Sequence, residues 1–205
     1  MRKISLSVLL SIMFICLLLL NNTYACVGKT IIIGSKDTST VQRLIDEILA
    51  LLINERTGTS VKLMQFDSAE KCRAAIISSE VDIYVEYTGS AMTEVLKVSE
   101  LKEKDAVFNL VKNEYNEKYN LIWLAPYGFD YPDGLKSEFK DKGIPSIAAP
   151  IIRKDTLKKF PALARLLTKL TGKISNEELS VLVKSVAGDN YKEIARKFLK
   201  ENKLI

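Results

Sequence analysis

The sequence contains no histidine among its 205 residues. Histidine is the side chain that most often acts as a general base near neutral pH, and it is the commonest metal ligand. Its absence excludes the serine–histidine and cysteine–histidine pairs of nucleophilic catalysis. Glycine-rich nucleotide motifs are absent as well, because Gly34-Ser35-Lys36 lacks the further glycines that such loops need. We therefore predict that the protein is not an enzyme and that it uses no metal ion or other cofactor.

Cysteine is scarce, with only Cys16, Cys26 and Cys72. So few cysteines make no disulfide framework, although a Cys26–Cys72 bond is an option in an exported protein. Cys72 lies in a helical pattern beside Ala74 and Ala75, and we expect it to be a buried thiol.

The single long hydrophobic run lies at the N-terminus, from Val8 to Leu20. It follows the basic pair Arg2-Lys3 and precedes Thr23-Tyr24-Ala25, which offers small side chains to a signal peptidase. The run is too short for a convincing membrane span. We predict that residues 1–25 are a signal peptide and that the protein is exported; an uncleaved anchor is the alternative.

Cys26 would be the first residue after this cleavage, which makes it a candidate for lipidation. Thr23 stands where a lipobox normally has a large aliphatic residue, so plain cleavage is the alternative. The mature protein is accordingly expected in the periplasm, or on the outer face of the membrane as a lipoprotein held only by that lipid.

The charge balance argues against a nucleic-acid partner. Residues 1–25 carry two basic residues and no acidic one, so their removal lowers the net charge from +5 to +3. Charges of both signs alternate along the predicted helices, which is typical of a solvated surface.

The rest of the chain alternates between short apolar strands and amphipathic helices. Five strands are predicted, over residues 30–33, 60–65, 80–87, 121–124 and 147–152. Helices are predicted between the first four strands, with Ser39 or Thr40 as the cap of the first helix, and the chain after 152 reads as all helix. Strand–helix repeats with short connections are typical of βαβ units. We predict one α/β lobe over residues 26–205, with a mostly parallel five-stranded sheet flanked by helices and a helical C-terminus.

Two further features bear on this sheet. Pro150 interrupts the fifth strand and predicts that it is an edge strand or that it ends there. Residues 125–145 hold three of the five prolines and three of the nine glycines, and they are predicted to be irregular.

The stretch from Glu80 to Gly89 offers the clearest binding chemistry. It alternates like a strand and then brings Tyr87 and Thr88 to a helix N-terminus, where an aromatic face can bind a cation and donors can bind an anion. Asp82 and Glu86 are too far apart along a strand for a tight carboxylate dyad, so we expect a solvated or turn-binding pair. An ordinary buried strand with a capped helix is the alternative.

Ligands of open parallel sheets bind at the carboxyl ends of the strands. The candidate ligand-binding residues in the loops there are Ser35, Lys36, Thr40, Tyr87, Thr88 and Phe129. Helix capping by Lys36 and the hydroxyls, and cover of the sheet edge by Phe129, are the alternatives.

Four stretches show a more specific pattern: residues 32–36 reading IIGSK with Thr40 and Gln42, residues 80–89 reading EVDIYVEYTG, residues 121–129 with Leu135, and residues 148–199 beginning AAPIIRK. Together they resemble the substrate-binding proteins of ABC importers for quaternary ammonium solutes such as glycine betaine, choline and carnitine. These are type II periplasmic binding proteins that close two lobes around a ligand.

The sequence departs from this family where the second lobe would be inserted. Only the 18 residues 130–147 separate Phe129 from Ala148, whereas a lobe needs at least ~50 residues. We predict that residues 130–146 form a short irregular link in its place. Asp133 also stands at a tyrosine position of the family, and Val85 replaces a proline.

The resemblance implies that the six candidate residues line the first-lobe half of a site for a small quaternary ammonium ligand. It also implies an ABC permease at the membrane as partner. Half of an aromatic cage leaves the cation hydrated, so this chain as a monomer is expected to bind the ligand weakly or not at all. The alternative is a non-binding interaction module that docks to a permease or to a separate second lobe.

Overall fold

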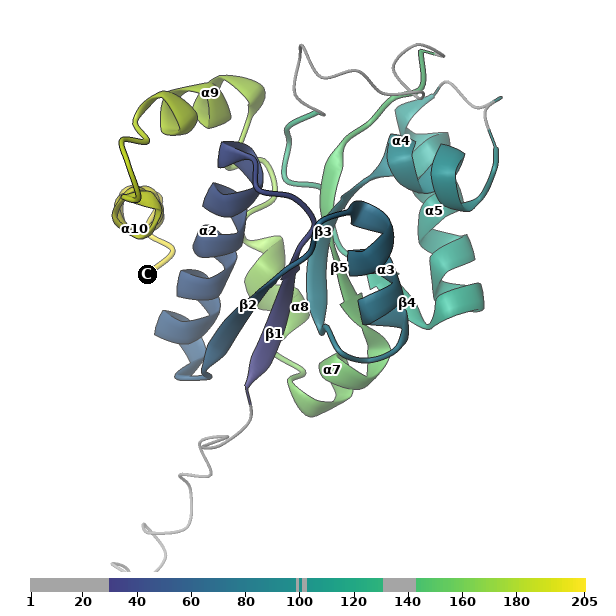
Figure 1. Cartoon of the computed structure of the whole chain (residues 1–205), viewed down its shortest axis with the longest axis horizontal. Coiled ribbons are helices and arrows are strands. Elements are labelled where there is room, and N and C mark those ends of the chain that lie inside the picture. Colours follow the sequence, from purple (N-terminus) through teal and green to yellow (C-terminus); the bar gives the residue numbers. More distant parts are fainter. Residues whose placement is uncertain (1–29, 99, 101–102, 131–142) are drawn as a thin grey trace, which may run out of the picture.

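The computed structural model describes residues 30–98, 100, 103–130 and 143–205 (Figure 1). The predicted signal peptide over 1–25, Cys26 and most of the predicted link over 130–146 lie outside the described residues. The described strands are β1 (Ile31–Ser35), β2 (Val61–Gln65), β3 (Ile83–Tyr87), β4 (Leu121–Trp123) and β5 (Ala148–Arg153). The described helices are α2 (Thr40–Thr57), α3 (Ala69–Ile77), α4 (Thr88–Ser90), the π-helix η1 (Ala91–Val95), α5 (Lys104–Tyr119), α7 (Lys154–Lys159), α8 (Leu163–Thr168), α9 (Asn176–Lys184) and α10 (Tyr191–Glu201).

The five strands form one sheet in the order β2-β1-β3-β5-β4. Strand β1 pairs in parallel with β2 and β3, whereas β5 pairs antiparallel with both β3 and β4. Four strands therefore run in one direction and β5 in the other. The predicted fold class, an α/β lobe with a mostly parallel sheet and a helical C-terminus, is confirmed.

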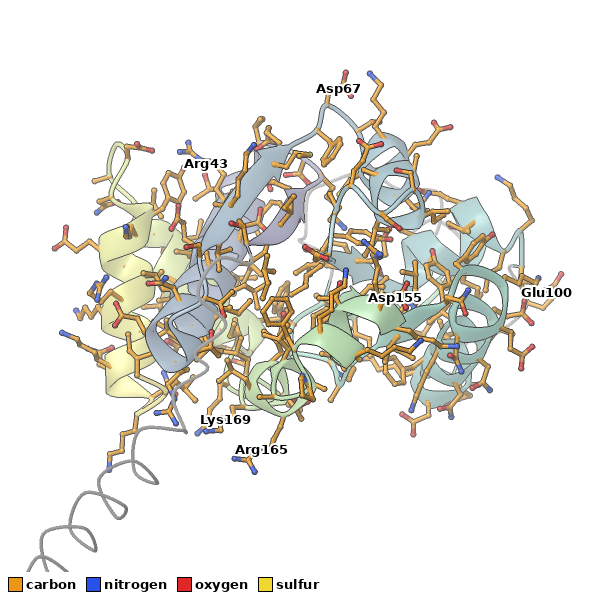
Figure 2. The ribbon with its side chains drawn as sticks, turned by 90° about the horizontal axis from the view of Figure 1, so that it is seen from below. Arg43, Asp67, Glu100, Asp155, Arg165 and Lys169 are labelled. Atoms are coloured by element: carbon orange, nitrogen blue, oxygen red, sulfur yellow. The ribbon has the colours of Figure 1, made fainter. Side chains whose placement is uncertain are left out.

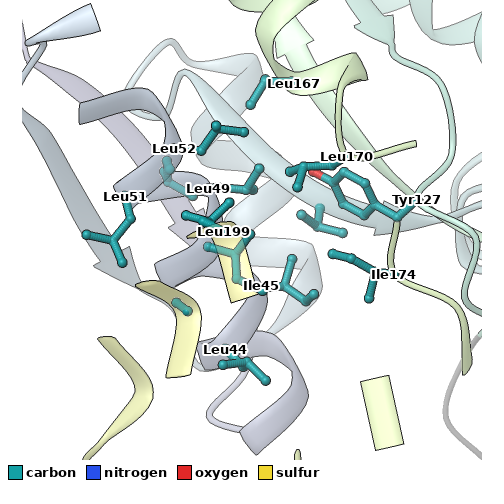
Figure 3. Packing of buried hydrophobic residues seen from close by; sticks show 14 of the residues in the cluster. Leu44, Ile45, Leu49, Leu51, Leu52, Tyr127, Leu167, Leu170, Ile174 and Leu199 are labelled. Carbon is teal, nitrogen blue, oxygen red and sulfur yellow. The ribbon is translucent and has the colours of Figure 1, made fainter. Parts of the chain in front are cut away.

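Helices cover both faces of the sheet. One core contains residues of α2, α8, α9 and α10, and the second contains residues of α3, η1 and α5 (Figure 1). In the first core, Leu49 and Leu52 of α2 lie near Leu167 of α8 and Leu199 of α10 (Figure 3). Because both faces are covered, all five residues of the central strand β3 are buried, whichever face their side chains point to.

Strand β5 is not an edge strand and does not end at Pro150, because it continues to Arg153, so both forms of the prediction from Pro150 were wrong. It lies between β3 and β4. The Leu124 N–H donates to the Pro150 carbonyl at 3.0 Å, one residue beyond the end of β4 at Trp123. Proline lacks an N–H to return this bond, and its position at the end of the shorter β4 ladder makes the missing donor tolerable.

Local signals set the ends of α2. The Ser39 hydroxyl accepts a hydrogen bond from the Gln42 N–H at 3.1 Å, so Ser39 is the N-cap. At the other end, Gly58 adopts φ 68°, a left-handed conformation that glycine takes without strain.

Strand β1 and helix α3 pack closely at Gly34. A Cβ on Gly34 would lie 2.7 Å from the Cys72 sulfur, which is why only a glycine fits. Cys72 is buried and free, as predicted, and burial raises the pKa of its thiol to about 12.

Within the described parts of the chain, no helix combines the length and hydropathy needed to cross a membrane. Charged residues such as Arg43, Arg165 and Lys169 are exposed and project from the outside of the molecule (Figure 2). The buried charged side chains, Lys36, Asp46, Arg73 and Glu86, are exceptions to this pattern.

Candidate functional site

The parallel pairing of β1 with β3 brings their carboxyl ends side by side. Lys36 follows β1 directly, and its ammonium nitrogen lies 4.2 Å from the ring centroid of Tyr87, the last residue of β3. The ring of Phe129 meets Tyr87 edge-on, with 6.3 Å between centroids. Three of the six predicted residues therefore converge at this edge of the sheet.

Thr88 joins the same edge to the chain before β5. Its hydroxyl donates to the Pro145 carbonyl at 3.2 Å and accepts from the Ile147 N–H at 3.2 Å. Its own N–H donates to the Ile147 carbonyl at 3.1 Å. These bonds use the hydroxyl to hold the backbone together, and the residue is only 1 % exposed.

Ser35 lines a pocket separate from the position between Lys36 and the rings of Tyr87 and Phe129. With Arg43, Asp46 and Gln65 it lines a pocket that also involves Tyr191 at the start of α10. Thr40, the first residue of α2, is half-buried. The structure therefore places Ser35 at a neighbouring pocket rather than with the aromatic rings.

Glu86 contradicts the expectation of a solvated carboxylate. It is fully buried, with its two oxygens 3.0 Å from the Lys36 ammonium and 2.9 Å from the Arg73 guanidinium. The Tyr87 N–H and the Tyr84 hydroxyl also donate to it, at 2.9 Å and 3.3 Å. Burial raises the pKa of Glu86, but the two cations and the hydrogen bonds outweigh it and hold the pKa below the usual value.

Asp82 has a different role from Glu86. Its carboxylate accepts from the Ile32 N–H at 2.9 Å and from the Thr156 hydroxyl at 2.6 Å. The two acids therefore do not act as a pair: Asp82 ties β3 to β1 and α7, and Glu86 neutralises two cations.

Two residues near this edge were missed by reasoning from sequence. Arg73 is buried beside Glu86, and Asp46 is fully buried on the core side of α2. The Gln42 amide donates to Asp46 at 2.8 Å. Burial raises the pKa of Asp46 to about 7, against the lowering effect of the polar side chains of Ser35 and Gln42. The spacing of Gln42 and Asp46, one helical turn apart within an apolar stripe, is the signal that could have revealed Asp46.

At this edge of the sheet the Lys36 ammonium lies between an aromatic face, that of Tyr87, and a buried carboxylate, that of Glu86. Such a pair suits an ammonium group. Across the described residues, no group of three or more carboxylate or thiol side chains is placed to hold a metal ion.

A family model described as the substrate binding domain of ABC-type glycine betaine transport systems matches residues 29–148 and 137–201. Similar curated proteins include the glycine-betaine-binding protein of Pseudomonas aeruginosa, 33% identical over 50% of this chain and 32% of that protein. The carnitine transport binding protein OpuCC of Listeria monocytogenes is 29% identical over 49% of this chain and 33% of that protein. The ergothioneine transport permease/binding protein EgtU of Helicobacter pylori is 28% identical over 50% of this chain and 18% of that protein.

The matched part of the chain thus spans about a third or less of these curated relatives, which fits a single lobe. Among solved structures, a glycine betaine/carnitine/choline ABC transporter protein aligns with a TM-score of 0.74 and 18% identity, covering 85% of this chain and 99% of that chain. YehZ from Escherichia coli aligns with a TM-score of 0.72 and 16% identity, covering 87% and 100%. At these identities the likeness establishes the fold, that of type II periplasmic binding proteins, and not the ligand.

Proposed function

We propose a role in solute import for this chain, because it belongs to the family of substrate-binding domains of ABC-type glycine betaine transport systems. This is a family of substrate-binding proteins and not of enzymes. We infer that the chain is the exported solute-binding component of an importer for quaternary ammonium osmoprotectants such as glycine betaine, choline and carnitine. Its partner would be the ABC permease at the membrane.

One observation carries the ligand class. An ammonium group, that of Lys36, lies on the Tyr87 ring and against the Glu86 carboxylate. This edge of the sheet therefore has the chemistry that holds a cation, and Phe129 extends its aromatic wall. A quaternary ammonium gains ~0.5–2 kcal/mol from each such face.

We further propose that binding by this chain is weak. Of the six candidate residues, five are at most 6 % exposed: Ser35, Lys36, Tyr87, Thr88 and Phe129. The link over 130–146 is too short to add a second lobe, so a ligand cation would keep part of its hydration shell. Residues 1–25 as signal peptide and Cys26 as candidate lipid anchor complete the proposal and would put the lobe in the periplasm or on the outer face of the membrane.

Calorimetric titration of the chain from residue 26 onward with glycine betaine, choline and carnitine tests direct binding. We expect saturable heat with at least one ligand. Tyr87→Leu removes the aromatic face and should weaken binding by ~2- to 30-fold, whereas Tyr87→Phe keeps the ring and should bind nearly as the parent does. Heat at the dilution background for all three ligands up to millimolar concentration would refute binding.

The burial of the candidate residues favours a second function, a non-binding interaction module that docks to the permease or to a separately encoded second lobe. Co-purification of the exported chain with either partner would support this function. A monodisperse monomer that recruits neither would count against it.

A further inference from the structure

Lys36 is a buried cation with two binding partners in the chain itself. Its side chain is 7% exposed, and its ammonium nitrogen is 3.0 Å from Glu86 and 4.2 Å from the Tyr87 ring centroid. The second oxygen of Glu86 is held separately by Arg73 at 2.9 Å. The carboxylate therefore has a countercharge of its own, and the Lys36 ammonium occupies a distinct position between Glu86 and the aromatic face.

This position has the two components that recognise a free ammonium ion, a π face and an anionic acceptor. The Lys36 ammonium occupies this position, and it is covalently attached to the loop that follows β1. Tethering gives the lysine ammonium an effective concentration in the millimolar range or above at this position. A free ligand must outcompete it, and must also leave the displaced lysine charge solvated.

We propose that Lys36 is a specificity-determining residue: its ammonium is a tethered occupant of the ammonium subsite between Tyr87 and Glu86, and free ammonium ligands enter only by displacing it. This rests on the proposed function for the identity of the natural ligand, a quaternary ammonium solute. The occupancy by Lys36 itself does not depend on that function. The subsite should therefore accept a small primary alkylammonium ion once the tether is removed.

Lys36→Ala provides this test, because it removes three methylenes and the ammonium beyond Cβ. The matching free molecule is n-propylammonium. Thermal unfolding is followed with increasing n-propylammonium chloride, with sodium chloride at the same ionic strength and n-propanol as a neutral analogue. Lys36→Met is the matched control variant, since it also lacks the charge but keeps the volume of the stem.

We expect n-propylammonium, and neither control solute, to raise the melting temperature of Lys36→Ala saturably. Its affinity for Lys36→Ala should exceed that for the parent and for Lys36→Met at least ten-fold. Equal effects on all three proteins, or a folded Lys36→Ala that does not respond, would overturn the proposal.

A measurement on the parent protein covers the case in which Lys36→Ala does not fold. A lysine ammonium above a ring places its ε-methylene protons in the shielding region of that ring. In NMR spectra of the parent, the Lys36 ε-protons should lie upfield of those of the exposed lysines. A Lys36 signal among those of the exposed lysines would overturn the proposal.

The two proposals fail separately. If Lys36→Ala binds n-propylammonium while the parent binds none of the three solutes, the transport ligand is wrong and the role of Lys36 stands. If the parent binds a solute but Lys36→Ala ignores n-propylammonium, Lys36 is not the occupant of the subsite.

Discussion

Replacing Asp46 by asparagine should change how the stability of the protein depends on pH. The Asp46 carboxyl is fully buried on α2, with one oxygen 2.8 Å from the Gln42 amide nitrogen. Burial raises its pKa from 3.8 to about 7 in the folded state. In the unfolded chain the carboxyl is solvated and titrates at its ordinary pKa.

The sign and size of the effect follow from these two values. Between them, the folded state keeps a proton that the unfolded state has released, so the contribution of Asp46 to the free energy of unfolding falls as the pH rises. The range between the unfolded and folded pKa values includes about two pH units above pH 5, and each unit is worth about 1.4 kcal/mol. The free energy of unfolding should therefore lose about 3 kcal/mol of the Asp46 contribution between about pH 5 and pH 8. Asparagine cannot ionise, keeps an oxygen for Gln42, and should not show this loss.

Other acids do not obscure the comparison. Burial also raises the pKa of Glu47, but both proteins contain Glu47, so its effect cancels in their difference. The pKa of Glu86 is lowered, so the stability that Glu86 contributes is present above its unfolded pKa and is lost only at more acidic pH, below this window.

Urea denaturation followed by circular dichroism at several pH values would measure the difference. Glu55→Gln, on the exposed side of the same helix, is the matched control. It weakens an exposed ion pair with Arg196, which can offset its stability from that of the parent, but its change with pH over this range should be parallel to that of the parent. We expect the free energy of unfolding of Asp46→Asn, relative to that of the parent, to increase as the pH rises. Parallel profiles for the parent and Asp46→Asn would refute the assignment of a buried, proton-holding carboxyl.

Three further substitutions test the fold around the site. Glu86→Gln should cost about 3–5 kcal/mol in urea denaturation, since two buried cations lose their shared countercharge; a loss below about 1 kcal/mol would contradict this. Gly34→Ala should cost about 1–3 kcal/mol because its methyl group meets the Cys72 sulfur, and part of that cost should disappear when Cys72→Ala is added; strictly additive effects would argue against the contact. Ser39→Ala should lower stability by about 1 kcal/mol in thermal melts through loss of the N-cap to Gln42, and an unchanged melting temperature would rule the cap out as a contributor.

Local features of this protein could be predicted from the sequence because they depend on neighbouring residues alone. The alternation of residues 80–87 identified β3, and Ser39 was one of the two candidate caps for the helix that is α2. The convergence of Lys36 and Tyr87 was also predictable, because adjacent parallel strands bring their carboxyl ends to one edge. The same stretches supported the family resemblance.

Only the tertiary structure decided how these groups are used. Alternation along β3 shows which side chains share a face, but it does not show that helices cover both faces, so the burial of Glu86 was missed. Arg73 reaches Glu86 from α3, a contact set by packing between elements. The antiparallel insertion of β5 beside β3 likewise depends on pairing between distant segments. Burial and long-range pairing are properties of the assembled sheet. Only the folded protein therefore shows that Lys36, a candidate ligand-binding residue, is itself a buried cation held by Glu86 and Tyr87.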